Sequence, residues 1–122
     1  MVIYITQDSG QNFSSLLKLS EKVVTVTSRD YPLFGDADDH VEKIKQMLKH
    51  FDVEKDALVP AGDPINISVV ANELFKKGGE ILFLKWDRQS SMYVPVKVKS
   101  NDKSDDSLSP NDQMSKINYK EK

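Results

Sequence analysis

Two groups of residues in this sequence have the types and positions that could bind a small anion. The first group follows a short apolar segment and consists of Thr6, Gln7, Asp8, Ser9 and Gly10. The second group, Gly62, Asp63 and Pro64, precedes an apolar helical pattern. A helix N-terminus offers unpaired N–H donors and the positive end of a dipole, which suit a phosphate or a carboxylate. These residues therefore predict a site for a nucleotide or another phosphorylated small molecule.

Other features of the second group favour a structural role. Neither group matches the G-x-G-x-x-G or P-loop pattern. Pro64 has no N–H to donate, and Asp63 would place a negative charge at the mouth of the site. Asp63 has the position of a helix N-cap, and Pro64 suits the first helical residue. Capping is therefore the favoured interpretation of Asp63, with ligand binding as the alternative.

A second candidate is an aromatic and charged cluster near residue 90. It consists of Trp86, Asp87 and Arg88, with Tyr93 following a predicted turn. Trp, Tyr and Arg dominate the hot spots of protein interfaces, so the cluster could be an interaction surface. A Trp and a Tyr that face each other across a hairpin also stabilise it, which is a purely structural alternative. The sequence leaves both interpretations open.

Patterns typical of catalysis or metal binding are missing from the sequence. The chain has no cysteine, which excludes disulfides, thiolate catalysis and cysteine-based metal sites. His40 and His50 are too far apart to share one helical face, and we expect His40 to be solvated. Asp36, Asp38 and Asp39 lack the spacing of a calcium loop and suit the start of a helix. We expect no catalytic residue, no metal and no cofactor.

Strand and helix patterns alternate along the chain. The strand patterns cover residues 2–6, 22–28, 57–61, 80–86 and 92–98, and the helical patterns cover residues 13–19, 40–51 and 65–77. This order predicts an α/β fold: a small Rossmann-like, three-layer domain whose mostly parallel sheet ends in an antiparallel hairpin. Pro95 predicts that the last strand lies at an edge. If strands 2–6 and 57–61 are neighbours, the two anion-binding groups flank one crevice.

Composition separates a domain from a tail. The chain has 122 residues, which suits one domain, expected over residues 1–98. Residues 99–122 form a polar tail, expected to be disordered unless a partner binds it; Met114, Ile117 and Tyr119 could form a docking motif there.

A net charge of -2 makes nucleic acid a less favoured partner. No apolar run is long enough to span a membrane, and a cytoplasmic location is expected.

Three segments together resemble a known group of proteins. They are residues 58–64 (LVPAGDP), residues 84–89 (LKWDRQ) and residues 93–96 (YVPV). With the apolar helix between the first two, they look like a group of small uncharacterised phage-encoded proteins with a GDP turn and a WDRQ…Y hairpin. The resemblance covers residues 57–98 and implies a phage origin, hence the cytoplasm of a host cell. It implies no activity.

Two hypotheses about function follow. In the first, favoured hypothesis, the protein is a small phage accessory factor that acts without catalysis by binding a phage or host macromolecule, most simply a protein. In the second, it is a nucleotide- or phosphate-binding domain, with or without enzymatic activity, that uses the loops after the first and third strands. A crevice filled by side chains would favour the first hypothesis, and an open one with converging N–H groups would favour the second.

Overall fold

A computed structural model describes residues 1–29 and 38–100 of the protein. It contains a five-stranded sheet of order β2-β1-β3-β4-β5. Neighbouring strands from β2 to β4 pair in parallel, and β5 pairs antiparallel with β4. The strands are β1 (Val2–Gln7), β2 (Lys22–Thr27), β3 (Ala57–Val59), β4 (Glu80–Asp87) and β5 (Met92–Lys99). The predicted α/β fold, with a mostly parallel sheet that ends in a hairpin, is confirmed.

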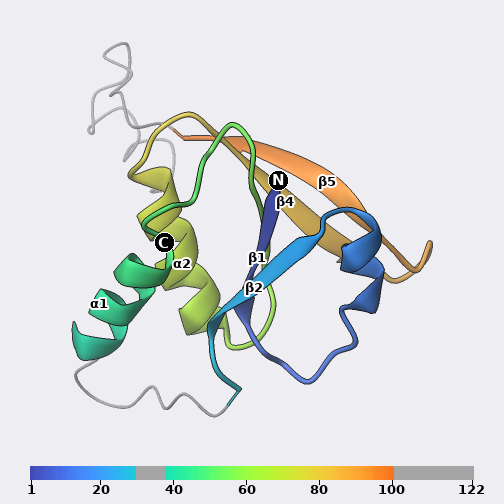
Figure 1. The fold of residues 1–122 in the computed structure, drawn as a ribbon, viewed down its shortest axis with the longest axis horizontal. Coiled ribbons are helices and arrows are strands. Elements are labelled where there is room, and N and C mark those ends of the chain that lie inside the picture. Colours follow the sequence, from blue (N-terminus) through green and yellow to red (C-terminus); the bar gives the residue numbers. More distant parts are fainter. Residues whose placement is uncertain (30–37, 101–122) are drawn as a thin grey trace, which may run out of the picture.

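The helices lie on both faces of the sheet. Two α-helices, α1 (Asp38–Met47) and α2 (Pro64–Phe75), cover one face, and a short 3-10 helix, η1 (Ser14–Lys18), covers the other (Figure 1). The α-helix predicted over residues 13–19 is thus wrong in type. The helix predicted over residues 40–51 begins earlier, at Asp38, and ends at Met47. Tight turns follow it and still bury the predicted core residues Leu48 and Phe51.

Each face of the sheet has its own hydrophobic core. Ile44 of α1 and Leu74 of α2 pack with sheet residues such as Leu58 in the first core. The second core is smaller, and η1 contributes one fully buried side chain to it, Leu16. Because η1 is short, Leu17 and Leu19 remain exposed on that side. The second face is therefore only partly covered.

β5 lies at one edge of the sheet, as Pro95 predicts. It extends to Lys99, and Ser100 is held in place by two hydrogen bonds: its N–H donates to Gly79 O (2.6 Å) and its hydroxyl to Phe75 O (2.7 Å). The tail beyond Ser100 lies outside the described residues, as does Asp36. None of the described helices is long and apolar enough to cross a membrane.

Candidate functional site

The loops that follow β1 and β3 meet at the carboxyl edge of the sheet. β1 pairs in parallel with β3 on one side and with β2 on the other. From β1 the chain connects to β2 on one side of the sheet, and the later strands β3 and β4 lie on the other side. β1 and β3 therefore flank a topological switch point, where open α/β sheets bind ligands. The predicted proximity of the two residue groups, Thr6–Gly10 and Gly62–Pro64, is confirmed, and their binding of an anion remains a prediction.

The side chain of Gln7 fills the space between these loops. Its Nε2 donates to Ser28 O (3.1 Å) after β2, and its Oε1 accepts from Asp63 N (2.7 Å) after β3. Gly62 lies directly against it with φ +96°, and a Cβ at this position would lie 2.6 Å from Gln7 Cβ. Gln7 therefore links the loops after β1, β2 and β3 and occupies the space between their described residues.

Thr6 ties the same loops together from inside the protein. It is fully buried, and its hydroxyl oxygen accepts from Ala61 N (2.7 Å) and also contacts Ala61 O. Thr27 Oγ1 donates to Thr6 O (2.8 Å). The polar groups of Thr6 thus have partners within the fold, and its role toward a ligand remains a prediction.

The loop after β1 is exposed, and the carboxylate of Asp8 within it has partners in the protein. Asp8 Oδ1 accepts from Gly10 N (3.1 Å) and lies 3.5 Å from Arg29 Nη2. Gly10 has φ +81°, and the guanidinium of Arg29 packs against it. Ser9 is exposed. The loop offers solvent-accessible polar groups, but Asp8 places a carboxylate among them.

The N-terminus of α2 offers few donors to an anion. Asp63 is its N-cap, with its carboxylate accepting from Ile65 N (2.7 Å), and Pro64 is the first helical residue, as predicted. The N–H of Asp63 is bound to Gln7, and Pro64 has none. This helix end is therefore closed by its own cap rather than open to a phosphate.

A buried polar pair joins α1 and α2, and the sequence analysis missed it. His40 Nε2 lies 2.6 Å from Asn66 Oδ1, and the two residues are 4% and 0% exposed. The expectation that His40 is solvated is wrong, because the residue lies on the inner side of α1. The spacing of His40, Ile44 and Leu48, four residues apart, could have placed it there.

Metal ligands are not gathered anywhere in residues 1–29 and 38–100. No group of three or more His, Asp or Glu side chains could hold an ion in this part of the chain. His40 lies against an amide, and Asp63 caps a helix. Asp38 and Asp39 occupy the first turn of α1, as expected for a negatively charged helix start.

The β4–β5 hairpin holds the aromatic cluster at the same edge of the sheet. Trp86 and Tyr93 are cross-strand partners, with ring centroids 5.0 Å apart and an edge-to-face angle of 66°. Trp86 remains 43% exposed, whereas Tyr93 is half-buried, and burial raises the pKa of its hydroxyl. With Gln11 and Asn12 they line a cavity of about 280 Å³. The predicted proximity of the two rings is confirmed.

The hairpin turn is stabilised by Asp87. Its Oδ2 accepts from the hydroxyl (2.6 Å) and the N–H (3.1 Å) of Ser90, and these bonds lower the pKa of the carboxyl below its ordinary value. Arg88 is exposed and forms no ion pair with any described residue. The turn therefore engages the carboxylate of Asp87 and leaves the guanidinium of Arg88 accessible.

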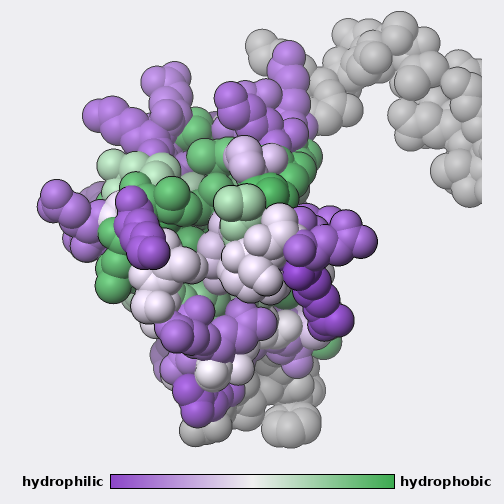
Figure 2. All heavy atoms as spheres, turned by 90° about the vertical axis from the view of Figure 1, so that its right-hand side faces the viewer, coloured by the Kyte–Doolittle hydropathy of each residue, from purple (hydrophilic) through white to green (hydrophobic). Residues whose placement is uncertain are grey.

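The side of the molecule that carries the hairpin and η1 is shown in Figure 2. Hydrophobic side chains gather there in one area with hydrophilic residues around it. Exposed apolar residues of the protein include Leu17, Leu19, Met92 and Trp86. The hairpin thus belongs to a surface that combines apolar and polar residues, a combination that is common in protein-binding surfaces.

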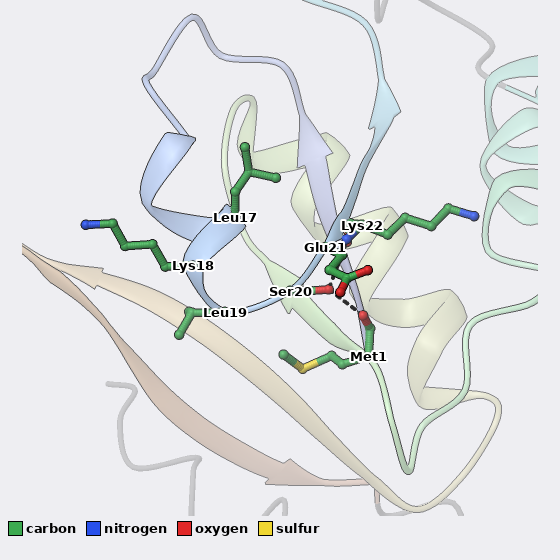
Figure 3. A pocket seen from close by; sticks show the side chains of 7 residues that line it. All are labelled: Met1, Leu17, Lys18, Leu19, Ser20, Glu21 and Lys22. Atoms are coloured by element: carbon green, nitrogen blue, oxygen red, sulfur yellow. Dashed lines mark hydrogen bonds between the residues drawn. The ribbon is translucent and has the colours of Figure 1, made fainter.

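A separate cavity of about 450 Å³ lies near the start of β1 (Figure 3). Met1, Leu17 and Leu19 supply its apolar part, and the side chains of Lys18 and Lys22 extend away from each other. Ser20 lies within it, but its hydroxyl bonds to backbone oxygens of Met1 and Lys22. A comparable cavity between Val53 and Lys97 opens at the same end of the sheet. The lining residues of both cavities form no recognisable catalytic set.

Comparison with known proteins identifies a phage family. Residues 6–100 match the family model described as Phage Pam3 gp32-like protein. No curated protein and no solved structure matches the chain. The match covers nearly the whole described domain and supports the expected phage origin. That the GDP turn and the WDRQ…Y hairpin are markers of the group remains a prediction.

Proposed function

The chain belongs to the Phage Pam3 gp32-like protein family, and on this premise we propose that it is a phage accessory protein that acts without catalysis. It binds a phage or host protein through the hairpin surface, which we define as Trp86, Asp87, Arg88 and Tyr93. The cytoplasm of the host cell is the proposed place of action.

The observation that carries this proposal is the closed crevice at the switch point. The place where an α/β sheet ordinarily binds a small ligand is filled by Gln7, whose amide is bonded to the loops after β2 and β3. A ligand there would have to displace these bonds and approach the carboxylates of Asp8 and Asp63. Binding of a nucleotide or another phosphorylated molecule is therefore the less supported function.

The hairpin surface has the chemistry of a protein-binding site. Trp86 and Tyr93 provide an edge-to-face aromatic pair in which Trp86 is 43% exposed, and Gln11 and Asn12 border it. Arg88 adds a charged group that has no ion-pair partner among residues 1–29 and 38–100. Rigid aromatic anchors beside an arginine lose little conformational entropy on binding and dominate interface energetics.

Site-specific photo-crosslinking in infected cells tests the proposal. A crosslinking residue replaces Gln89 at the exposed tip of the hairpin, and the control replaces the exposed Gln46 of α1, on the opposite face of the sheet. We expect position 89 to capture one defined protein, and the Arg88→Ala substitution to reduce this product several-fold. Position 46 should not capture that protein.

Two outcomes would contradict the proposal. One is equal capture from both positions, or capture that is unaffected by Arg88→Ala. The other is thermal stabilisation of the protein by a nucleotide or a sugar phosphate. A ligand at a hundredfold excess over its Kd would add about 2.7 kcal/mol to the free energy of unfolding, which a thermal scan resolves easily.

A further inference from the structure

The chain beyond Ser100 begins with an acidic segment. Residues 101–112 (NDKSDDSLSPND) contain four aspartates and one lysine, and their apolar residues are Leu108 and Pro110. The next ten residues (QMSKINYKEK) differ, with three lysines and one glutamate. The acidic segment is therefore opposite in charge to the last ten residues of the chain.

The hairpin from which this segment leaves has the opposite charge. It carries four exposed cations, Lys85, Arg88, Lys97 and Lys99, and two acidic residues, Glu80 and Asp87. None of the four cations pairs with an acidic residue in the described part of the chain. The carboxylate of Asp87 is engaged by Ser90. The hairpin thus offers unpaired positive charge to an acidic segment.

Ser100 fixes the starting point of the acidic segment. It is 8% exposed and bonded to Gly79 O and Phe75 O, so the chain leaves from a defined place at the end of β5. Six residues of strand separate Tyr93 from Lys99, or about 20 Å. The eight residues from Ser100 to Leu108 can span up to about 27 Å. The acidic segment is therefore long enough to return along β5 to the aromatic pair.

The cavity beside the aromatic pair suits one or two side chains. Its volume of about 280 Å³ lies below the range of about 300–1,000 Å³ that is usual for drug-sized ligands. Its walls combine two aromatic rings with Gln11 and Asn12. Asn12 Oδ1 accepts from Ser14 N (2.9 Å), and the side-chain amide of Gln11 can bond to a peptide backbone. Aromatic-lined grooves of this kind bind proline-containing peptides.

We propose that residues 101–112 dock in the same molecule on the hairpin surface, with Leu108 and Pro110 against Trp86 and Tyr93. Asp105 and Asp106 then lie near Lys97, which alternation places on the same face as Tyr93, and Asp112 lies near Arg88 in the turn. The tail becomes an internal competitor for the surface that the proposed function assigns to a partner, and only this competition rests on that function. A short linker gives an effective concentration of the order of mM, so even a weak contact is substantially populated.

Quenching of Trp86 fluorescence by acrylamide in the full chain tests the docking. Trp86 is the sole tryptophan, so the signal reports on this surface alone. Replacing both Leu108 and Pro110 by serine should raise the quenching constant about twofold, as expected if a tail at mM effective concentration covers about half of the molecules. The matched control, Lys116→Glu with Lys120→Glu, alters the basic part of the tail and should leave quenching unchanged.

A charge exchange provides the second arm. Arg88→Glu should raise quenching, and adding Asp112→Lys, which follows Pro110 toward the hairpin turn, should restore the protection. Because Arg88 lies in neither of the two cores, the circular dichroism spectrum and the melting temperature should not change. Quenching that is the same in wild type and tail variants would overturn the proposal. Protection that increases with protein concentration would also overturn it, because the tail would then bind a second copy.

The docking and the proposed function can fail separately. The quenching measurement needs no partner, so it can succeed where crosslinking from position 89 finds no defined protein. Conversely, position 89 can capture one defined protein while the tail does not protect Trp86 from acrylamide. That result would support the partner surface and contradict the docking of the tail. If both hold, the serine variant of Leu108 and Pro110 should also increase the crosslinked product.

Discussion

Two regions at the carboxyl edge of one sheet differ in how their polar and aromatic groups are used. Between β1 and β3, Gln7 and Thr6 bond to neighbouring loops and leave the switch point closed. On the β4–β5 hairpin, the carboxylate of Asp87 is bonded within the turn, while Trp86 and Arg88 remain exposed. The first region has partners inside the molecule, and the second region has groups available for partners outside it.

The difference shows that position in a fold does not by itself make a site. The topology of an open α/β sheet favours the switch point for ligand binding. Here the side chain of Gln7 occupies that position and bonds to the loop after β3, and Gly62 leaves the space that this side chain needs. The switch point therefore has a structural role. The hairpin has no such topological advantage, but its aromatic pair lies at the open edge of the sheet, where a protein surface can reach it.

The largest expected effect is that of Gly62→Ala on stability. The residue has φ +96°, and its new Cβ would clash with Gln7, so we expect a loss of about 2–4 kcal/mol in the free energy of unfolding. Gly10→Ala is the matched control: its φ is +81°, but the nearest atoms belong to the flexible end of the Arg29 side chain, and about 1 kcal/mol should be lost. If urea unfolding gave both variants the same loss in the free energy of unfolding, the close packing of Gly62 against Gln7 would not contribute to stability.

The next effect is that of Thr6→Val, which keeps the shape of the side chain and removes its hydroxyl. The N–H of Ala61 then loses its buried acceptor, and we expect a loss of about 1–3 kcal/mol. Thr25→Val on the exposed side of β2 should change stability by about 0.5 kcal/mol or less. If chemical denaturation gave the two variants the same stability, the buried link between the loops would not contribute.

A smaller effect is expected for the aromatic pair of the hairpin. A double-mutant cycle with Trp86→Ala and Tyr93→Ala should give a coupling of about 0.5–1.5 kcal/mol, as usual for edge-to-face rings. The single Trp86→Ala substitution should cost less stability than Thr6→Val, because the indole is 43% exposed. A larger cost would assign Trp86 to the core and not to a binding surface.

The smallest effect concerns pH and the hairpin turn. The hydroxyl and the N–H of Ser90 lower the pKa of Asp87, so the ionised carboxylate stabilises the folded protein above its ordinary pKa, near 3.8. This stabilisation is lost as the pH falls through the lowered value. In an NMR titration, Ser90→Ala should move the pKa of Asp87 back toward the ordinary value. An unchanged titration curve would mean that the hydroxyl bond does not stabilise the turn.

The sequence predicts the scaffold better than the state of the site. The alternation of patterns and Pro95 predict the strand order at the hairpin end, and Asp63-Pro64 predicts the start of α2, because these signals are local. The closure by Gln7 depends on contacts with residues 21 and 56 positions away, for which no local signal exists. The burial of His40 was detectable from its four-residue spacing to Ile44, but its place in the first turn of α1 suggested exposure.

The most direct test is the affinity of the crosslinked partner, once it is identified, for variants of the two regions. Trp86→Ala and Arg88→Ala change the hairpin surface, whereas Ser9→Ala and Asp63→Asn change the loops after β1 and β3. By isothermal titration calorimetry, we predict that each hairpin substitution weakens binding at least about tenfold, or about 1.4 kcal/mol, while the loop substitutions leave Kd within about twofold. Loss of affinity in the loop variants with unchanged affinity in the hairpin variants would contradict the account.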